Sequence, residues 1–303
     1  MTPIPDGVRR DIDRALEARG HAPVESASSV AGGCIHNGAR LDGGGDAWFL
    51  KWSPKAPAGV FEAEADGLEA LRAAAPSGIR VPHVLTWGTA VDGAWLLMEY
   101  VAPGPGGRSW HGALGRGLAE LHRAGSDAEG GFGWHRDNWI GSLPQGNERH
   151  PSWPVFWRDR RIAPQLERAR RAGHLTDAPV LDRLVAAIPA ALEAVDATPP
   201  SLVHGDLWSG NVFPDAAGVP VLIDPAPYRG HGEVDLAMAE LFGGFDPGLL
   251  AAYREGATDA EGYERVRRPL YQLYYLLVHV NLFGAGYERG ARSAARAVVE
   301  AVT

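Results

Sequence analysis

Hydrophobic and polar residues alternate in two different ways over the first hundred positions. Apolar side chains recur with helical spacing in two stretches, which predicts helices at residues 8–19 and 60–71. Short apolar runs bounded by turn residues instead predict extended segments at 29–41, 47–52, 81–88 and 94–101. We therefore expect a β-meander, a helix and a further pair of strands in this part of the chain.

A run of proline and glycine follows this strand-rich part. Residues 103–107 read Pro-Gly-Pro-Gly-Gly, which is typical of a linker, so we expect a domain boundary between residues 1–102 and 103–303. Beyond it, helical spacing predicts helices at 110–125, 153–172, 178–196 and, as the last long helix, 263–283.

One stretch beyond the linker has no regular period. Residues 131–147 are dense in aromatic and polar side chains, a mixture that is common in ligand-binding loops. Trp134 and Trp139 are its largest side chains. Either could face a ligand, and either could equally be a plug over the core.

Composition and charge narrow the class of protein. Hydrophobic residues make up 45% of the chain and charged residues 22%, which is ordinary for a globular protein. The net charge of −8 argues against a nucleic-acid partner. No apolar run approaches the roughly 20 residues of a membrane helix, and no signal-peptide pattern is evident. We therefore expect a cytoplasmic enzyme with no membrane partner.

The first chemical signal is an aspartate and an asparagine that follow an apolar strand. Asp206 and Asn211 lie five positions apart, as in the kinase catalytic loop, where the aspartate accepts the hydroxyl proton and the asparagine holds magnesium. Gly205 stands where protein kinases have arginine. Taken alone, His-Gly-Asp is also common turn chemistry, so other residues must decide between the two interpretations.

A second aspartate follows thirteen residues after Asn211. The apolar run at 221–223 ends in Asp224, which presents a carboxylate at a strand end, where the kinase template needs another magnesium ligand. The next residues are Pro-Ala, whereas protein kinases have Phe-Gly. An aspartate after a strand is often only a loop residue, but this distance from the first motif allows a hairpin.

A lysine and a glutamate upstream are the expected partners of these residues. Lys51 lies inside an otherwise apolar strand, so it is either an exposed edge residue or the lysine that binds nucleotide phosphates. Glu64 lies next to the buried face of the helix predicted at 60–71 and is the expected partner of Lys51. Glu62 points elsewhere, and both glutamates could be simple surface charges.

Backbone groups complete the expected nucleotide site. Gly32 and Gly33 lie in the first turn of the predicted meander, where N–H groups can approach phosphate oxygens. This turn does not match the Walker P-loop pattern. Residues 99–103 occupy the position of a kinase hinge, where backbone groups around Glu99 and Val101 would bind adenine.

Two polar residues near the end of the chain have open roles. Asp235 could hold the catalytic loop through hydrogen bonds to its backbone, or it could be an ordinary charge at a helix N-terminus. His279 is the polar exception in the helix predicted at 263–283. A buried, hydrogen-bonded histidine is its plainer interpretation.

Together these segments resemble the fructosamine kinase (ketosamine-3-kinase) family, within the aminoglycoside phosphotransferase and choline kinase-like group. The resemblance extends from about residue 31 to residue 284. Its most telling motifs are His204-Gly205-Asp206-Leu207-Trp208-Ser209-Gly210-Asn211, Ile223-Asp224-Pro225-Ala226 and Gly230-His231-Gly232-Glu233. It implies an α+β, two-lobed protein kinase-like fold, with a small N-terminal antiparallel β-sheet lobe that includes a helix and a larger, mostly helical C-terminal lobe.

The same resemblance implies transfer of the ATP γ-phosphate to the 3-hydroxyl of a ketosamine, either a small molecule or protein-bound. The 3-phosphate would then fall apart and release the amine. Asp206 would be the base, and Asn211 and Asp224 would be ligands of Mg²⁺. Lys51 with Glu64 would orient the α- and β-phosphates.

The resemblance also suggests where the acceptor binds. Trp208, next to the base, would help to form the sugar pocket, with Trp134 and His279 as looser candidates. One local departure is His36-Asn37, which replaces a single asparagine after isoleucine in the glycine-rich turn. The alternatives are a kinase for an aminoglycoside or a choline-like amino alcohol, and a nucleotide-binding regulator that has lost catalysis.

The single cysteine, Cys34, excludes an internal disulfide framework. It lies in the expected phosphate-binding turn, where it is either a small apolar residue or a redox control point. We therefore expect a monomer, or a homodimer linked through this cysteine.

Overall fold

A five-stranded sheet forms the N-terminal part of the chain. The computed structural model describes residues 3–30, 36–105, 107, 109–126, 130–176, 178–256 and 261–302. Within these ranges the sheet has the order β1-β2-β3-β5-β4, and every neighbouring pair is antiparallel. Its strands are β1 (Ser26–Ser29), β2 (Asn37–Gly43), β3 (Asp46–Ser53), β4 (Val84–Ala90) and β5 (Gly93–Glu99).

One helix covers each face of this sheet. Helix α1 (Asp6–Glu17) packs with Trp95 and Leu97 of β5, and α2 (Val60–Ala74) packs with Leu96 and Met98 of the same strand. Because successive side chains of a strand point to opposite faces, α1 and α2 lie on opposite sides. Lys51 on β3 is directly opposite Leu96, so its side chain lies on the α2 side.

The segment after β5 joins the sheet to the rest of the molecule. It runs from Glu99 to Ser109, where the next helix begins. Gly104 in this segment donates its N–H to the carbonyl of Pro214, 2.8 Å away. We propose that the two lobes divide here, after residue 102.

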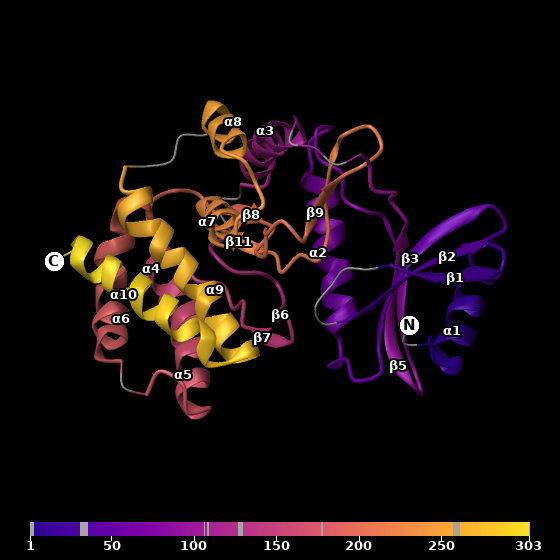
Figure 1. The fold of residues 1–303 in the computed structure, drawn as a ribbon, viewed down its shortest axis with the longest axis horizontal. Helices are drawn as coiled ribbons and strands as arrows, with labels where there is room; N and C mark the ends of the chain where they lie inside the picture. Colours follow the sequence, from indigo (N-terminus) through magenta and orange to yellow (C-terminus); the bar gives the residue numbers. More distant parts are fainter. Residues whose placement is uncertain are drawn as a thin grey trace.

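Helices dominate the C-terminal part, and the expected α+β fold is confirmed. Figure 1 shows several of these helices gathered at the end of the long axis opposite α1. The longer helices are α3 (Ser109–Ala124), α5 (Ala163–Arg171), α6 (Pro179–Leu192), α7 (Glu233–Leu241), α8 (Gly248–Gly256), α9 (Arg268–Phe283) and α10 (Glu288–Val302). The shorter ones are α4 (Trp153–Phe156), η1 (Trp157–Ile162), η2 (Glu193–Val195), η3 (Tyr263–Arg267) and η4 (Ala285–Tyr287). No described helix combines the length and the apolar character needed to cross a bilayer.

Three short antiparallel pairs of strands lie between the sheet and the helices (Figure 1). They pair β6 (Asn138–Ile140) with β7 (Leu143–Gln145), β8 (Ser201–Val203) with β11 (Tyr228–Gly230), and β9 (Val212–Pro214) with β10 (Pro220–Leu222). The first of them corrects the prediction that residues 131–147 are an irregular loop. Strands of three residues are too short to produce a visible period in the sequence.

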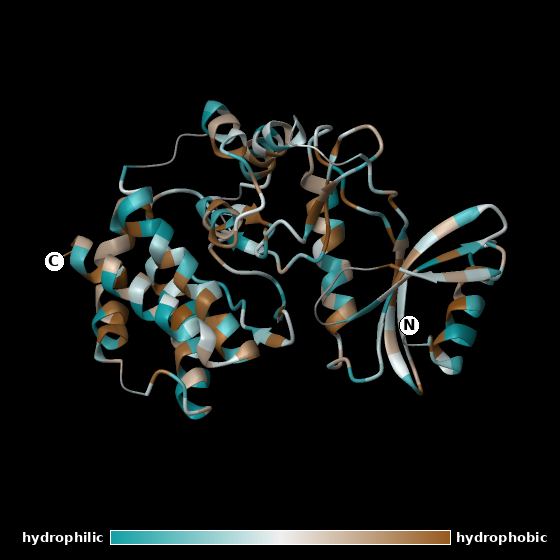
Figure 2. Ribbon diagram, in the orientation of Figure 1, coloured by the Kyte–Doolittle hydropathy of each residue, from teal (hydrophilic) through white to brown (hydrophobic). Residues whose placement is uncertain are grey.

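The prediction that residues 263–283 form the last long helix is wrong, because α10 follows it. Gly284, with a φ of 87°, ends α9 and allows the chain to turn. Helix α10 buries only Ala291, Ala295 and Val298. These side chains are small, but Figure 2 shows hydrophilic residues interleaved with apolar ones along this helix, which is the pattern of an amphipathic helix.

Candidate active site

The candidate catalytic loop begins at a glycine that no other residue could replace without strain. Strand β8 leads into His204 and Gly205, and Gly205 has a φ of 80°. A Cβ atom at this position would lie 2.1 Å from the carbonyl oxygen of Ala226. Glycine therefore allows the chain to pass close to the segment that follows Asp224, and it places Asp206 at the turn.

A buried carboxylate fixes the backbone of this loop. Asp235, at the start of α7, is fully buried and accepts the N–H groups of His204 at 2.7 Å and Gly205 at 2.9 Å. His122 Nε2 also donates to it, at 3.1 Å. Burial opposes ionisation of Asp235, but these donors hold its pKa below the usual value. The hypothesis that Asp235 holds the loop is confirmed by these contacts.

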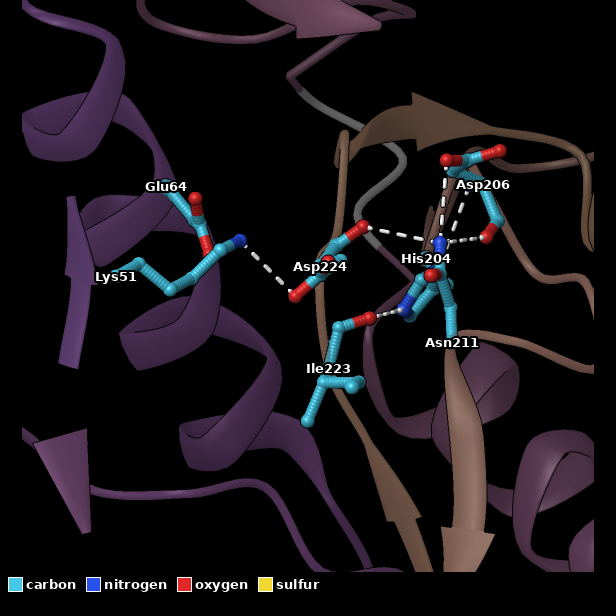
Figure 3. A network of polar contacts seen from close by, with 7 residues as sticks. All are labelled: Lys51, Glu64, His204, Asp206, Asn211, Ile223 and Asp224. Atoms are coloured by element: carbon cyan, nitrogen blue, oxygen red, sulfur yellow. Dashed lines mark hydrogen bonds and ion pairs between the residues drawn. The ribbon is translucent and has the colours of Figure 1, made fainter. Parts of the chain in front are cut away.

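His204 connects the loop to the strand that ends in Asp224. Its Nδ1 accepts the N–H of Asp206 at 3.3 Å, so Nε2 carries the proton and donates it to the carbonyl of Ile223 at 2.9 Å. Burial lowers the pKa of His204, which agrees with a neutral ring. The ring is thus a structural link between the two motifs (Figure 3).

Asp206 and Asn211 face each other across the turn. Asn211 Nδ2 donates to the backbone oxygen of Asp206 at 2.9 Å and to its Oδ2 at 3.1 Å. Burial, together with the negative charge of Asp224, raises the pKa of Asp206 to about 7, although the Asn211 hydrogen bond opposes the shift. A carboxylate with such a pKa can accept a proton near neutral pH.

Lys51 joins the sheet to the second aspartate. Its Nζ lies 2.6 Å from Glu64 Oε1 and 3.0 Å from Asp224 Oδ1 (Figure 3). Burial alone would lower the pKa of Lys51, but these two carboxylates outweigh it and raise the pKa above its usual range. Asp224 has a φ of 56°, an uncommon conformation for a residue other than glycine and one that recurs at functional sites.

A cavity of about 490 Å³ lies where these residues meet. It is bordered by most of the residues expected in the site: Lys51, Glu64, Glu99, Val101, Asp206, Trp208, Asn211 and Asp224. Figure 3 shows Lys51 and Glu64 approaching Asp224 from one side, and Asp206 and Asn211 approaching it from the other. Gly32, Gly33 and Cys34 lie outside the described residues.

Two of the expected pocket residues do not border this cavity. Trp134 instead donates its indole N–H to Asp66 Oδ2 at 2.8 Å. His279 hydrogen-bonds through Nδ1 to the carbonyl of Tyr275 at 2.8 Å, and its ring packs against Phe242 and Tyr287. His279 is therefore hydrogen-bonded, as its plainer interpretation expected, but it is half-buried and not buried. The pocket assignments of His279 and Trp134 are not supported by the cavity.

Several further residues border the cavity without having been assigned to it, and two of them belong to sequence features noted above. Trp139, at the centre of β6, is one of them, and the aromatic density of residues 131–147 was its signal in the sequence. His36, in the departure from the family pattern, is the other, and its ring lies 5.0 Å from that of Phe61. Burial and the nearby charge of Lys51 lower the pKa of His36 to about 4, so the ring is neutral near pH 7.

The donor set at the cavity fits a magnesium ion that is shared with a nucleotide. Within the described ranges, no group of three or more His, Cys, Asp or Glu residues could hold a metal. Magnesium commonly uses only one or two carboxylates plus substrate phosphates. Asp224 and the amide oxygen of Asn211 could supply such ligands.

The sequence as a whole matches the model of one protein family, fructosamine kinase, over residues 9–301. The chain belongs to the fructosamine kinase family. Relatives of this fructosamine kinase family member include a probable ketoamine kinase of Synechocystis, which is 42% identical over 89% of this chain and 88% of its own length. Another is the chloroplastic protein-ribulosamine 3-kinase of Arabidopsis thaliana, 37% identical over 89% of this chain and 81% of its own length.

Solved structures agree with this fructosamine kinase family assignment. A Thermobifida fusca protein, named provisionally as a fructosamine-3-kinase, has a TM-score of 0.83 and 37% identity over 95% of this chain and 97% of its own. An aminoglycoside phosphotransferase has a TM-score of 0.64 and 17% identity over 98% and 99% of the two chains. The second likeness shows a shared fold alone.

Proposed function

We propose that the chain is an ATP-dependent kinase that phosphorylates the 3-hydroxyl of ketosamines such as fructosamines and ribulosamines. The observation that carries this proposal is that Asp206, Asn211, Asp224 and Lys51 border one cavity in a member of the fructosamine kinase family. The names of its relatives, ketoamine kinase and protein-ribulosamine 3-kinase, support this class of substrate.

In this proposal the N-terminal part of the site binds the nucleotide. Lys51 contacts the α- and β-phosphates, and Glu64, 2.6 Å from its Nζ, holds the ammonium in place. The backbone near Glu99 and Val101, which border the same cavity, binds adenine. The predicted contact of Gly32 and Gly33 with the phosphates lies outside the described residues.

The C-terminal part of the site handles the acceptor. Asp206 orients the acceptor hydroxyl and receives its proton, a role that its pKa of about 7 favours near neutral pH. Asn211 and Asp224 hold magnesium, which when bound supplies positive charge for the phosphate oxygens. Because phosphoryl transfer requires little covalent work from a protein, positioning by these residues provides most of the rate.

The sugar would bind next to the base. Trp208 borders the cavity two residues after Asp206, and Trp139 borders it from the β6–β7 hairpin. Aromatic side chains provide flat apolar surfaces with a polar edge, which suits the C–H faces and hydroxyls of a sugar. We propose both tryptophans as walls of the ketosamine pocket.

The test is magnesium-dependent ATP consumption with fructoselysine, a ribulosamine and an aminoglycoside, compared side by side. We expect turnover of a ketosamine, with its 3-phosphate as the first product. Turnover of the aminoglycoside alone would retain a kinase and overturn the substrate class. ATP binding without turnover of any acceptor would favour the regulatory alternative.

Oligomeric state, redox control and location remain predictions from the sequence. If Cys34 is a redox control point, oxidation will produce a covalent dimer with altered activity, and Cys34→Ala will abolish both effects. A monomeric wild type that ignores oxidant would contradict this. We propose a cytoplasmic location, although one plant relative is named as chloroplastic.

A further inference from the structure

Three consecutive residues of the C-terminal part contact the side of helix α2 that carries Glu62 and Asp66. Trp134 Nε1 donates to Asp66 Oδ2 at 2.8 Å, and His135 Nε2 lies 3.0 Å from Asp66 Oδ1. Arg136 Nη1 lies 3.1 Å from Glu62 Oε1. We refer to residues 134–136 as the α2 contact segment.

The residue directly before the α2 contact segment is held by backbone hydrogen bonds. Gly133 exchanges two backbone hydrogen bonds with Arg229, at 2.9 and 2.8 Å. Arg229 lies in β11, directly after residues 224–227. Helix α2 also meets those residues, because a Cβ on Gly67 would lie 2.7 Å from Pro227 Cγ. The helix is therefore held against the part of the chain that carries Asp224.

Helix α2 carries the acidic residues Glu62, Glu64 and Asp66, and their spacing links its attachment to the position of Glu64 in the site. Glu62 and Asp66 are four residues apart and share one side of the helix. Glu64 lies between them and, at about 100° per residue, projects to nearly the opposite side. There it contacts Lys51 at 2.6 Å. Movement of α2 away from the α2 contact segment would therefore also move Glu64.

We propose that Asp66 and Trp134 are positioning residues, whose hydrogen bond fixes α2 and thereby holds Glu64 on Lys51. This inference rests on the proposed function, in which Lys51 binds the nucleotide phosphates. It gives Trp134, which does not border the cavity, a role in the reaction from outside the cavity. Its indole N–H binds a carboxylate on α2, in place of the sugar contact that the resemblance suggested.

The test is the affinity for MgATP, measured by calorimetry alongside thermal unfolding. We expect Asp66→Ala to weaken ATP binding about tenfold, the equivalent of about 1.4 kcal/mol. Asp66→Asn should lose less, because its amide oxygen can still accept the indole N–H. The matched control is Glu69→Ala, which removes an exposed acid from the same helix and should leave ATP binding unchanged.

The same Asp66 substitution in a Glu64→Gln protein distinguishes a positioning role from a general loss of stability. In a Glu64→Gln protein, Asp66→Ala should have little further effect on ATP affinity, because the residue it positions has already been altered. An effect of equal size in both backgrounds, or one no larger than that of Glu69→Ala, would overturn the inference. If Asp66→Ala does not fold, Trp134→Phe, which retains the aromatic ring, is judged by the same criteria.

The binding measurement also separates this inference from the proposed function. If wild type phosphorylates no ketosamine but binds ATP, the substrate assignment fails while the comparison between the Asp66 and Glu69 variants still decides the role of α2. If ketosamine turnover is normal and the Asp66 variants bind ATP as wild type does, the positioning role fails alone.

Discussion

The two halves of the candidate site are held in place by different means. Asp206 belongs to a loop whose preceding backbone N–H groups are bound by Asp235, a carboxylate that is fully buried within the C-terminal part. Lys51 is held by ion pairs to Glu64 and to Asp224, and the latter is 173 positions away along the chain. One half therefore depends on a single buried network, and the other depends on contacts between separate parts of the molecule.

From this difference we expect one half of the site to control turnover and the other to control nucleotide binding. The buried network fixes Asp206, the proposed base, regardless of where the sheet lies, so loss of this side chain should appear in turnover. The ion pairs of Lys51 depend on the placement of α2 and of Asp224, so damage there should appear in nucleotide binding. The predictions below test this division, from the largest expected effect to the smallest.

Removal of the base should have the largest effect. We expect Asp206→Ala to lower kcat by about 10³-fold, within the range that general base catalysis contributes. The KM for ATP should change little, because Lys51 contacts Glu64 and Asp224 and not Asp206. Steady-state kinetics with a ketosamine measure both constants. Unchanged turnover would remove Asp206 from the mechanism.

Removal of Lys51 should weaken the binding of ATP. We expect Lys51→Met to weaken ATP binding at least about tenfold, since hydrogen bonds to charged groups contribute about 1.5–3 kcal/mol. Calorimetric titration with MgATP measures this, and Lys55→Met, at an exposed position after the same strand, is the control. The division between the halves would be broken if Lys51→Met left ATP binding intact and lowered kcat as much as Asp206→Ala.

The pH dependence of kcat/KM should come from Asp206 and not from Lys51. Asp206 must be ionised to accept a proton, and its pKa is raised to about 7 by burial and by Asp224. The protonated, inactive fraction therefore grows as the pH falls, and kcat/KM should decrease about tenfold per pH unit below 7. Lys51, with a pKa above its usual range, should stay charged throughout.

A profile of kcat/KM from pH 5.5 to 9, together with ATP affinity over the same range, measures this prediction. The Asp206→Ala variant is the control. Ionisation of ATP changes ATP affinity equally in this variant and in wild type, so a difference between the two profiles reports Asp206. A wild-type profile that is flat through pH 7 would contradict the assignment of Asp206 as the group that titrates.

The sequence was most informative where contacts follow from short spacings. The motifs around Asp206, Asn211 and Asp224 carry their geometry locally, as a turn and a hairpin. The pairing of Lys51 with Glu64 was predicted from the kinase pattern, and the buried face of one helix decided between Glu62 and Glu64.

Other features depended on packing that no local pattern contains. Trp134 and Trp139 come from the same aromatic stretch, yet only Trp139 borders the cavity, because the path of the β6–β7 hairpin decides which ring faces it. Tertiary contacts decide this case. Helix α10, in contrast, has the amphipathic spacing of a surface helix, so its sequence pattern could have predicted it although its buried side chains are small.

The smallest expected effect concerns the face of the sheet that is remote from the site. Asp92, in the turn between β4 and β5, accepts the N–H groups of Gly7 at 2.7 Å and Val8 at 2.9 Å, and so caps the N-terminus of α1. Asp92→Ala should lower the free energy of unfolding by about 1 kcal/mol, as for other lost helix caps. Urea denaturation measures this loss. Asp92→Asn should restore only part of it, because its single amide oxygen replaces two carboxylate oxygens that each accept one N–H group.

The same variant should leave kcat and the KM for ATP unchanged, because α1 packs on the face of the sheet opposite α2 and Lys51. A loss of ATP affinity in Asp92→Ala would show that the two faces are coupled through the sheet. In that case the placement of Lys51 would depend on the whole N-terminal part and not only on α2 and Asp224. An unchanged affinity with reduced stability would confine the control of nucleotide binding to the face that carries α2.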